Sequence, residues 1–434
     1  MASFVDNLGT FIQGQVPNHP DRARALLTAA YSWVQLSGKL SSAPDAARAT
    51  DHANAAVAST LTKSFRHPEN AVMVSMFTPC EILHAMGIQP LFPEGLSVYL
   101  ACTNAVDVFV QAAEEADIPE TFCSYHKTMI GVAETGVMPA PRLIMNTTIA
   151  CDANNLSFRR LADFYGIDQV LIDVPHAMDE DAVAYVADQL RAAVPAIEEA
   201  VGRSLDADKL RETMAVSAKT LASLDRYLAA RPNVSLHSTT TGEMCTVIAS
   251  HVMLGRPEAL AYMEEMEGYA ADAAQHPVNP QLARILWLHT LPNWQMSLRD
   301  ILETSTAAEI VGCDMAVDAL GVGRRAVPID VDKPFESMAR RVVYGAFNGP
   351  ATNRANVALS TAQQLGADGA IVFCHWGCKQ TLGASQLIKE TFEQSGIPCL
   401  VLDGDGCDRR NVAEGQMITR LNAFIEQLQA KRRA

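Results

Sequence analysis

Three of the ten cysteines stand where a parallel α/β fold places its ligands. Cys151 follows the strand-like run "PRLIMNTTIA" and precedes the helix-like "DANNLSFRRLADFYG", and Cys378 lies between "GAIVFCHWG" and "TLGASQLIKETFEQSG". Cys123 lies in a loop that enters a short helical segment. Ligands collect at the carboxyl ends of parallel strands, and a helix N-terminus lowers the pKa of a thiol. This placement favours thiolate ligands of a metal centre.

Local spacing alone does not decide between ligation and burial. These cysteines are far apart in the chain, so they form no compact zinc ribbon or ferredoxin run, and a small buried apolar residue remains the alternative for each. Four other cysteines are expected to be small buried apolar residues of the core: Cys102, Cys245, Cys313 and Cys399.

Other site patterns are incomplete. Cys374, His375 and Cys378 resemble part of a zinc site without a fourth ligand. The loop "DGDGCDRRNVAE" has acidic residues at EF-hand positions, but Asp408 occupies the glycine position. Neither a phosphate loop nor a dinucleotide-binding glycine motif occurs in the sequence.

The elements that must position these residues alternate between strand and helix. Short apolar runs separated by helix-length periodic segments indicate βαβ units and a parallel sheet. The expected strands cover residues 71–77, 88–93, 141–148, 168–175, 283–292, 309–316, 369–374 and 397–406. We predict an α/β fold with two lobes, in four segments: a helical N-terminal segment (1–68), a first α/β lobe (69–178), a mainly helical segment (179–280) and a second α/β lobe (281–434).

Composition and charge narrow the class of protein. The net charge of −15 disfavours binding to nucleic acid or to an anionic membrane surface. The longest apolar runs are too short to span a bilayer, and the N-terminus lacks the pattern of a secretory signal. We therefore expect a cytoplasmic protein whose cysteines are free, catalytic or metal-bound.

Six segments, in order, resemble the 2-hydroxyacyl-CoA dehydratase and benzoyl-CoA reductase family. They are "SMFTPCEILHAMGIQPLF", "CSYHKTMIGVAE", "TTIACDANNLSFRRLADFYG", "RILWLHTLPNW", "GAIVFCHWGCKQ" and "DGDGCDRRNVAEGQMITRLNAFIEQL". The resemblance covers roughly residues 73–428 and leaves out the first sixty or so. It implies two α/β lobes with a 4Fe-4S cluster between them, held by Cys123, Cys151 and Cys378.

The same resemblance implies roles for four more residues. His375 and Trp376 would tune the cluster potential and exclude water from it. The family's active-site Ser and Glu fall near Ser75 and Glu94. A satisfied histidine, a packed tryptophan, a strand-end hydroxyl and a solvated loop carboxylate are the alternatives for these four positions.

The implied reaction removes water from a 2-hydroxyacyl-CoA to give a 2-enoyl-CoA through a ketyl radical. The implied partners are a second subunit of the same family, an ATP-hydrolysing 4Fe-4S activator that supplies the electron, and the acyl-CoA substrate. A benzoyl-CoA reductase-type or other low-potential iron-sulfur reductase subunit is an alternative. A further alternative comes from another class of protein: a non-redox scaffold or a zinc-stapled binding protein.

One cysteine departs from the implied pattern. Cys80 is extra to the three ligands, and if it bound the fourth iron the subunit would be an electron relay. Cys374 in place of Cys378 is a further alternative. The acyl group and the residues that contact CoA are not assignable from the sequence.

Overall fold

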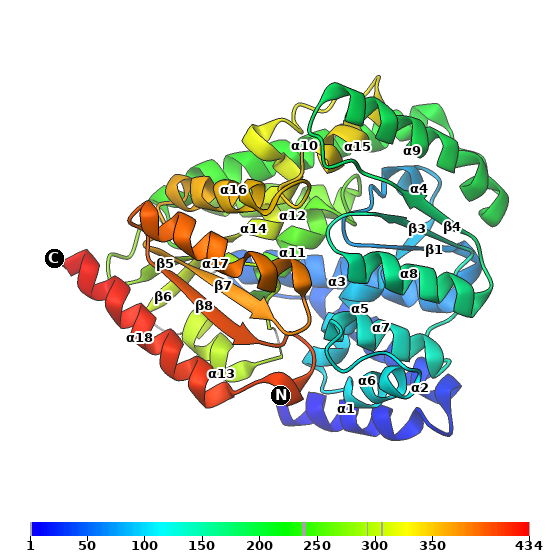
Figure 1. The fold of residues 1–434 in the computed structure, drawn as a ribbon, viewed down its shortest axis with the longest axis horizontal. Helices are drawn as coiled ribbons and strands as arrows, with labels where there is room; N and C mark the ends of the chain where they lie inside the picture. The colour runs from blue at the N-terminus through cyan, green and yellow to red at the C-terminus, as the bar shows by residue number, and fades with distance from the viewer. Residues whose placement is uncertain (1, 237–239, 293, 305–306, 434) are drawn as a thin grey trace.

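Two four-stranded parallel sheets form the centres of two lobes, as the ribbon in Figure 1 shows. The computed structural model describes residues 2–236, 240–292, 294–304 and 307–433. The first sheet has the order β2-β1-β3-β4 and the second β6-β5-β7-β8. The strands are β1 (Ala71–Val74), β2 (Gln89–Leu91), β3 (Leu143–Thr147), β4 (Gln169–Ile172), β5 (Ala283–Leu288), β6 (Ala308–Cys313), β7 (Gly369–His375) and β8 (Cys399–Gly404).

The strands form where the sequence is continuously apolar. Every residue of β5, β6 and β7 is buried, as expected for parallel strands covered by helices on both faces. Each of the eight runs expected from the sequence contains one strand, so the predicted α/β fold with two parallel sheets is confirmed. The four segment boundaries stay predictions.

Helices of the first lobe connect and cover its strands. They are α4 (Glu81–Ala85), α5 (Pro93–Cys102), α6 (Asp107–Glu115), α7 (Ser124–Glu134) and α8 (Asp152–Tyr165). Pro93 begins α5, a position where a fixed φ and a missing N–H cost nothing. Gly166 ends α8 with φ +62, a conformation that glycine adopts without steric penalty.

Three N-terminal helices pack against the first lobe. They are α1 (Ala2–Gln15), α2 (Pro20–Lys39) and α3 (Asp45–Arg66), and α1 and α2 lie beneath α6 and α7 in Figure 1. The Gln13 amide donates to the Asn104 carbonyl at 2.6 Å, and Arg24 Nε donates to the Val137 carbonyl at 2.8 Å. The predicted helical N-terminal region is therefore present and attached to the first lobe.

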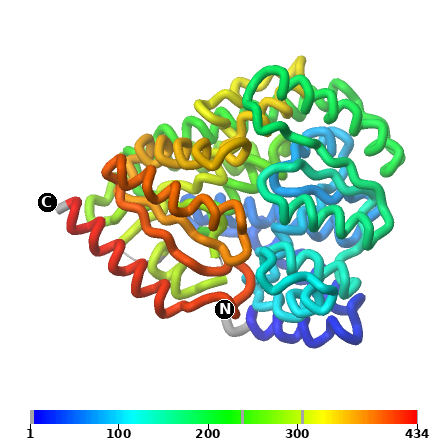
Figure 2. Tube along the Cα trace, in the orientation of Figure 1, coloured from blue at the N-terminus to red at the C-terminus, as the bar shows by residue number. Residues whose placement is uncertain are grey.

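A helical region joins the two sheets. It contains α9 (Glu180–Val201), α10 (Ala207–Ala230), α11 (Thr240–Ser250) and α12 (Pro257–Ala271). Asp179 and Asp206 cap α9 and α10 by accepting hydrogen bonds from backbone N–H groups. Helix α11 lies near the centre of the molecule in Figures 1 and 2, and nearly all of its residues are buried.

The remaining helices belong to the second lobe or are short turns. The remaining α-helices are α13 (Met296–Arg299), α14 (Asp314–Val317), α15 (Pro334–Val343), α16 (Ala351–Gln364), α17 (Lys379–Gln394) and α18 (Glu414–Arg433). Short turns are η1 (Pro68–Asn70), η2 (Arg231–Asn233), η3 (Asp300–Thr304), η4 (Asp318–Leu320), η5 (Val322–Arg324) and η6 (Arg409–Asn411). Within the described ranges, no helix combines the length and apolar character that a membrane span needs.

Candidate functional site

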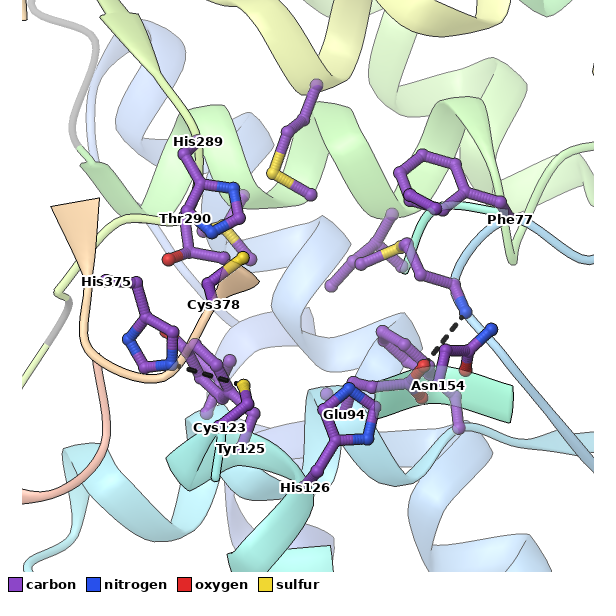
Figure 3. A pocket seen from close by; sticks show the side chains of 18 of the residues that line it. Phe77, Glu94, Cys123, Tyr125, His126, Asn154, His289, Thr290, His375 and Cys378 are labelled. Atoms are coloured by element: carbon purple, nitrogen blue, oxygen red, sulfur yellow. Dashed lines mark hydrogen bonds between the residues drawn. The ribbon is translucent and has the colours of Figure 1, made fainter. Parts of the chain in front are cut away.

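A cavity of about 330 Å³ is lined by residues from the carboxyl ends of strands in both sheets. Its lining includes Met76 and Phe77 after β1, Phe92 and Glu94 after β2, Ile149, Ala150 and Cys151 after β3, His289 and Thr290 after β5, Met315 after β6, and Cys378 after β7. Proteins with parallel sheets bind their ligands at the carboxyl ends of the strands, because the loops that lead into the next helices meet there. Figure 3 shows the two sets of side chains around one space.

All three predicted ligand cysteines line this cavity. Each is also the residue immediately before a helix: Cys123 caps α7, Cys151 caps α8 and Cys378 caps α17. The first two belong to the first lobe and the third to the second, so the fold brings together thiols that are distant in the sequence. Cys123 and Cys378 are 6% and 9% exposed.

Burial and neighbouring thiols raise the pKa values of Cys123 and Cys151. The pKa of Cys123 is raised well above its ordinary value by burial, then by the charges of Cys378 and Cys151. Burial, followed by Cys378, raises the pKa of Cys151 to about 12. Backbone N–H groups at the starts of α7 and α8 lower both pKa values by less. A lowered thiol pKa, expected from the helix N-termini, is therefore wrong for these two residues, because removal from water outweighs the helix ends.

His375 donates a hydrogen bond to one of the predicted ligands. The backbone N–H of Gly406 donates to His375 Nδ1 at 3.0 Å, so this nitrogen is the acceptor and the ring proton lies on Nε2. Nε2 lies 3.3 Å from the Cys123 sulfur (Figure 3). Burial lowers the pKa of the imidazole and keeps it neutral. Trp376, the next residue, is 45% exposed and is not among the cavity-lining residues.

Glu94 places a carboxyl group inside the cavity. It lies in the first turn of α5, and its carboxylate accepts from the Met76 N–H at 3.2 Å. Its Oε2 is buried and has no hydrogen-bond partner among the described residues. Burial raises the pKa of Glu94 to about 8. The alternative of a solvated loop carboxylate does not describe this residue.

Ser75 lies just outside the cavity lining. Its hydroxyl is buried and lies 2.8 Å from the Thr78 hydroxyl, and the neighbouring Met76 and Phe77 face the cavity instead. This arrangement holds the end of β1. A catalytic role for Ser75 stays a prediction.

The other cysteines divide differently from expectation. Cys80 is buried outside the cavity lining and donates to the Thr78 carbonyl at 3.2 Å, and Cys374 is likewise outside it. Neither therefore shares the cavity with the three predicted ligands. Of the four cysteines expected to be buried, Cys245, Cys313 and Cys399 are buried and Cys102 is exposed. Cys102 and Cys245 also line the cavity, which was not expected. Only the packing of α5 and α11 reveals this, because the sequence does not indicate which face of a helix meets the opposite lobe.

Two buried histidines in the cavity were not predicted from the sequence. His126, in α7, has no partner for Nδ1 in the described part of the chain, and burial lowers its pKa to about 3. His289 has no partner for either ring nitrogen in the described part of the chain. Its position directly after the β5 strand was the available signal, since the same rule identified Cys378.

The rest of the cavity wall is mainly apolar. It includes Val98 and Tyr99 from α5, Met244 and Ile248 from α11, and Phe77 and Phe347 from loops. Among the described lining residues, Arg299 is the only arginine or lysine, and it pairs with Glu303 at 3.0 Å. The cavity thus has three thiols and three imidazoles that could hold or contact a ligand, a carboxyl group with a raised pKa, and an apolar wall.

Comparison with known proteins identifies the family of the chain. The sequence model of the family described as 2-hydroxyglutaryl-CoA dehydratase, D-component, matches residues 75–428. The chain belongs to this family.

Individual relatives of this dehydratase family are distant but cover most of the chain. The alpha subunit of (R)-phenyllactyl-CoA dehydratase from Clostridium sporogenes is 22% identical, over 82% of this chain and 89% of the relative. The alpha subunit of lactoyl-CoA dehydratase from Anaerotignum propionicum is 24% identical, over 81% and 89%. A benzoyl-CoA reductase subunit from Thauera aromatica is 21% identical, over 83% and 89%.

The cavity of this family member suits the cluster that the sequence resemblance implies. Three buried or half-buried thiols share it, a neutral imidazole donates to one sulfur, and each cysteine lies at the N-terminus of a helix. In the described ranges no three His, Cys, Asp or Glu side chains converge on a point that would hold a single metal ion. Cluster thiolates bind separate irons and so lie farther apart than the ligands of one ion.

Proposed function

We propose that this chain is the iron-sulfur subunit of a 2-hydroxyacyl-CoA dehydratase, which removes water from a 2-hydroxyacyl-CoA to give a 2-enoyl-CoA. The observation that carries this proposal is the meeting of Cys123, Cys151 and Cys378, from both lobes, on a cavity that also contains a carboxyl group. Family membership supports the same reaction class.

In this proposal the chain supplies the ligands of a 4Fe-4S cluster and their surroundings. Cys123, Cys151 and Cys378 would hold the cluster, which would supply low-potential redox chemistry and a Lewis-acid site. His375 donates its Nε2–H to the Cys123 sulfur and so stabilises negative charge there. The buried position of the thiols excludes water from the ligands.

Glu94 holds a proton where the leaving group needs one. A carboxyl group with a pKa of about 8 is protonated at neutral pH, and its Oε2 is unpartnered in the described part of the chain. One electron on the thioester carbonyl gives a ketyl radical anion, which breaks the C2–O bond and makes the C3 proton acidic. Glu94 Oε2 gives its proton to the departing hydroxide, which leaves as water. The Glu94 carboxylate left behind takes the acidic C3 proton, and the product ketyl radical anion formed by this loss gives up the electron to leave the 2-enoyl-CoA.

The apolar wall indicates the class of acyl group. Phe77, Met244, Ile248 and Phe347 offer no group that pairs with a second carboxylate, and Arg299 is already paired with Glu303. A branched or aromatic apolar acyl group is therefore favoured over a dicarboxylate such as 2-hydroxyglutaryl, since an unpaired buried carboxylate is costly.

Partners follow from the reaction and from the relatives. The dehydratase relatives are named as alpha subunits, so we propose that a second subunit of the same family completes this enzyme. The sequence contains no phosphate loop, so a separate ATP-hydrolysing 4Fe-4S activator supplies the electron. The complex would act in the cytoplasm.

The test is iron content followed by turnover. Protein purified without oxygen should be brown and contain about four irons per chain. C123S, C151S and C378S should each lose most of this iron, whereas C399S, a buried cysteine outside the cavity lining, should retain it. A folded, colourless, iron-free wild-type protein would contradict the proposal.

Turnover then separates the candidate reactions. With activator and partner subunit, 2-hydroxy-4-methylpentanoyl-CoA and phenyllactyl-CoA should lose water faster than 2-hydroxyglutaryl-CoA. Reduction of benzoyl-CoA with no dehydration of any 2-hydroxyacyl-CoA would instead assign the chain to the reductase branch.

A further inference from the structure

His289 is a buried histidine of the cavity lining whose ring nitrogens have no hydrogen-bond partner among the described residues. Its side chain is 8% exposed, and neither Nδ1 nor Nε2 has a hydrogen-bond partner in the described ranges. A neutral imidazole carries one donor and one acceptor, and leaving both unpaired in an apolar setting is costly. Figure 3 shows its ring at the end of the cavity that also contains Thr290 and Cys378.

The backbone of His289 is held in a conformation that non-glycine residues rarely adopt. Its φ is +82, in the left-handed region, directly after β5. The Asp314 carboxylate accepts from the His289 N–H at 2.7 Å, and Arg354 Nε donates to the other oxygen of this carboxylate at 2.8 Å. Such strain persists where neighbouring groups enforce it, and it concentrates at functional sites. Here a buried ion pair holds the backbone N–H of His289.

The charges around the ring favour its neutral form. Burial, then Arg354 and His375, lower the pKa of His289 well below its ordinary value. A neutral imidazole donates an N–H without adding a positive charge. Donors of this kind stabilise an oxygen that becomes negative during a reaction, because they are already oriented before the charge develops.

We propose that the ring N–H of His289 donates a hydrogen bond to the carbonyl oxygen of the bound acyl thioester. The carbonyl oxygen only accepts hydrogen bonds, and it is the atom that gains negative charge when the thioester takes up an electron. Glu94 then serves the neighbouring 2-hydroxyl, so the two oxygens of the substrate have separate partners. This inference rests on the proposed function, since it assigns a residue to the same substrate.

The experiment measures binding of a thioester that has the carbonyl but lacks the 2-hydroxyl. The probe is 3-phenylpropanoyl-CoA, titrated calorimetrically into the complex purified without oxygen. H289G relaxes the backbone strain and removes the ring, so it should fold. H289N tolerates positive φ and retains an amide N–H. D117G is the matched control, because Asp117 also has positive φ, at +65, but is exposed and outside the cavity lining.

The expected result is a Kd about tenfold weaker for H289G, a smaller loss for H289N and no change for D117G. With a 13C-labelled thioester, the infrared carbonyl band should lie at lower frequency in wild type than in H289G, a signature that a purely structural role would not produce. Equal Kd values and equal carbonyl bands in wild type and H289G would overturn the inference while leaving the dehydratase proposal intact. Failure of wild type to bind any acyl-CoA would instead defeat the proposed function, and this inference with it.

Discussion

The two lobes reach the cavity through the same ends of their strands but contribute different chemical groups. The first lobe supplies two thiols and a carboxyl group, from Cys123, Cys151 and Glu94. The second lobe supplies one thiol and two neutral imidazoles, from Cys378, His375 and His289. The carboxyl group therefore comes from the first lobe alone, whereas neutral imidazoles come from both lobes, since His126 of α7 also lines the cavity.

The lobes also differ in how their groups are held. Glu94 is positioned within its own lobe by the Met76 N–H. His375 depends on the loop after β8, where the Gly406 N–H fixes its tautomer. That loop is bonded to the first lobe, since the Ser124 hydroxyl donates to Asp405 Oδ1 at 2.5 Å. The contact between His375 and Cys123 therefore depends on how the two lobes pack against each other.

The largest effect on turnover is expected for a substitution of Glu94, the proposed proton donor of the first lobe. E94Q retains the size of the side chain and its contact with Met76 but removes the acid. Turnover should fall by about 10²- to 10⁴-fold, the range for losing a general acid, with iron content unchanged. Steady-state dehydration and iron analysis check this, with Q380N, a conservative change at another lining residue, as the control. Retention of full activity in E94Q would remove the carboxyl group from the reaction.

The raised pKa of Glu94 also predicts how stability depends on pH: the free energy of unfolding falls as the pH rises. A folded-state pKa of about 8 lies above the ordinary glutamic acid value of 4.5, so the folded protein binds the proton more tightly than the unfolded one. Its contribution to stability is complete below pH 4.5 and is lost as the pH rises towards 8. Denaturant unfolding should show a smaller loss of stability between pH 6 and pH 9 in E94Q than in wild type.

A second large effect is expected at the junction of the lobes. Asp405 is fully buried and accepts from the Ser124 hydroxyl and from the Cys407 and Asp408 N–H groups. D405A leaves these donors unpaired and should cost about 3 kcal/mol of unfolding free energy, since hydrogen bonds to a charged group are strong. Urea unfolding measures this. D403A removes an exposed acid from the same strand end and should change stability by under about 0.5 kcal/mol.

A smaller effect is expected for the hydrogen bond that crosses the junction. H375F retains a ring but removes the Nε2–H donated to Cys123. Losing about 1 kcal/mol of stabilisation of the negative sulfur corresponds to a potential about 40 mV more negative. Spectroelectrochemical titration of the anaerobic protein measures the shift, and iron content should remain near wild type. An unchanged potential would show that this contact does not tune the centre.

Much of the fold was predictable because both faces of its strands are covered. A continuous apolar run as short as β5 or β7, bounded by turn residues, is typical of a buried parallel strand, and the carboxyl ends of such strands then identified Cys151 and Cys378. The rule that ligands lie between the carboxyl end of a parallel strand and the next helix needs only the order of strand, loop and helix. It therefore worked for residues that directly follow a strand or begin a helix.

Features set by contacts between distant segments were not predictable. The helix α5 that carries Glu94 into the cavity follows a short strand and was not expected. Cys102 and Cys245 face the cavity because α5 and α11 present those sides to the opposite lobe. The thiol pKa values depend on how much protein covers the sulfur atoms, which local sequence does not indicate.

The smallest effect is expected at Trp376, beside His375 in the sequence but not in the site. Trp376 lies in the turn that follows β7 and is 45% exposed, whereas His375, the last residue of β7, is fully buried. W376A should therefore leave iron content, visible absorption and potential within experimental error of wild type. The three measurements made for H375F provide the comparison. A shift in potential as large as that of H375F would place the indole against the cluster ligands and restore the role that the family resemblance implies for it.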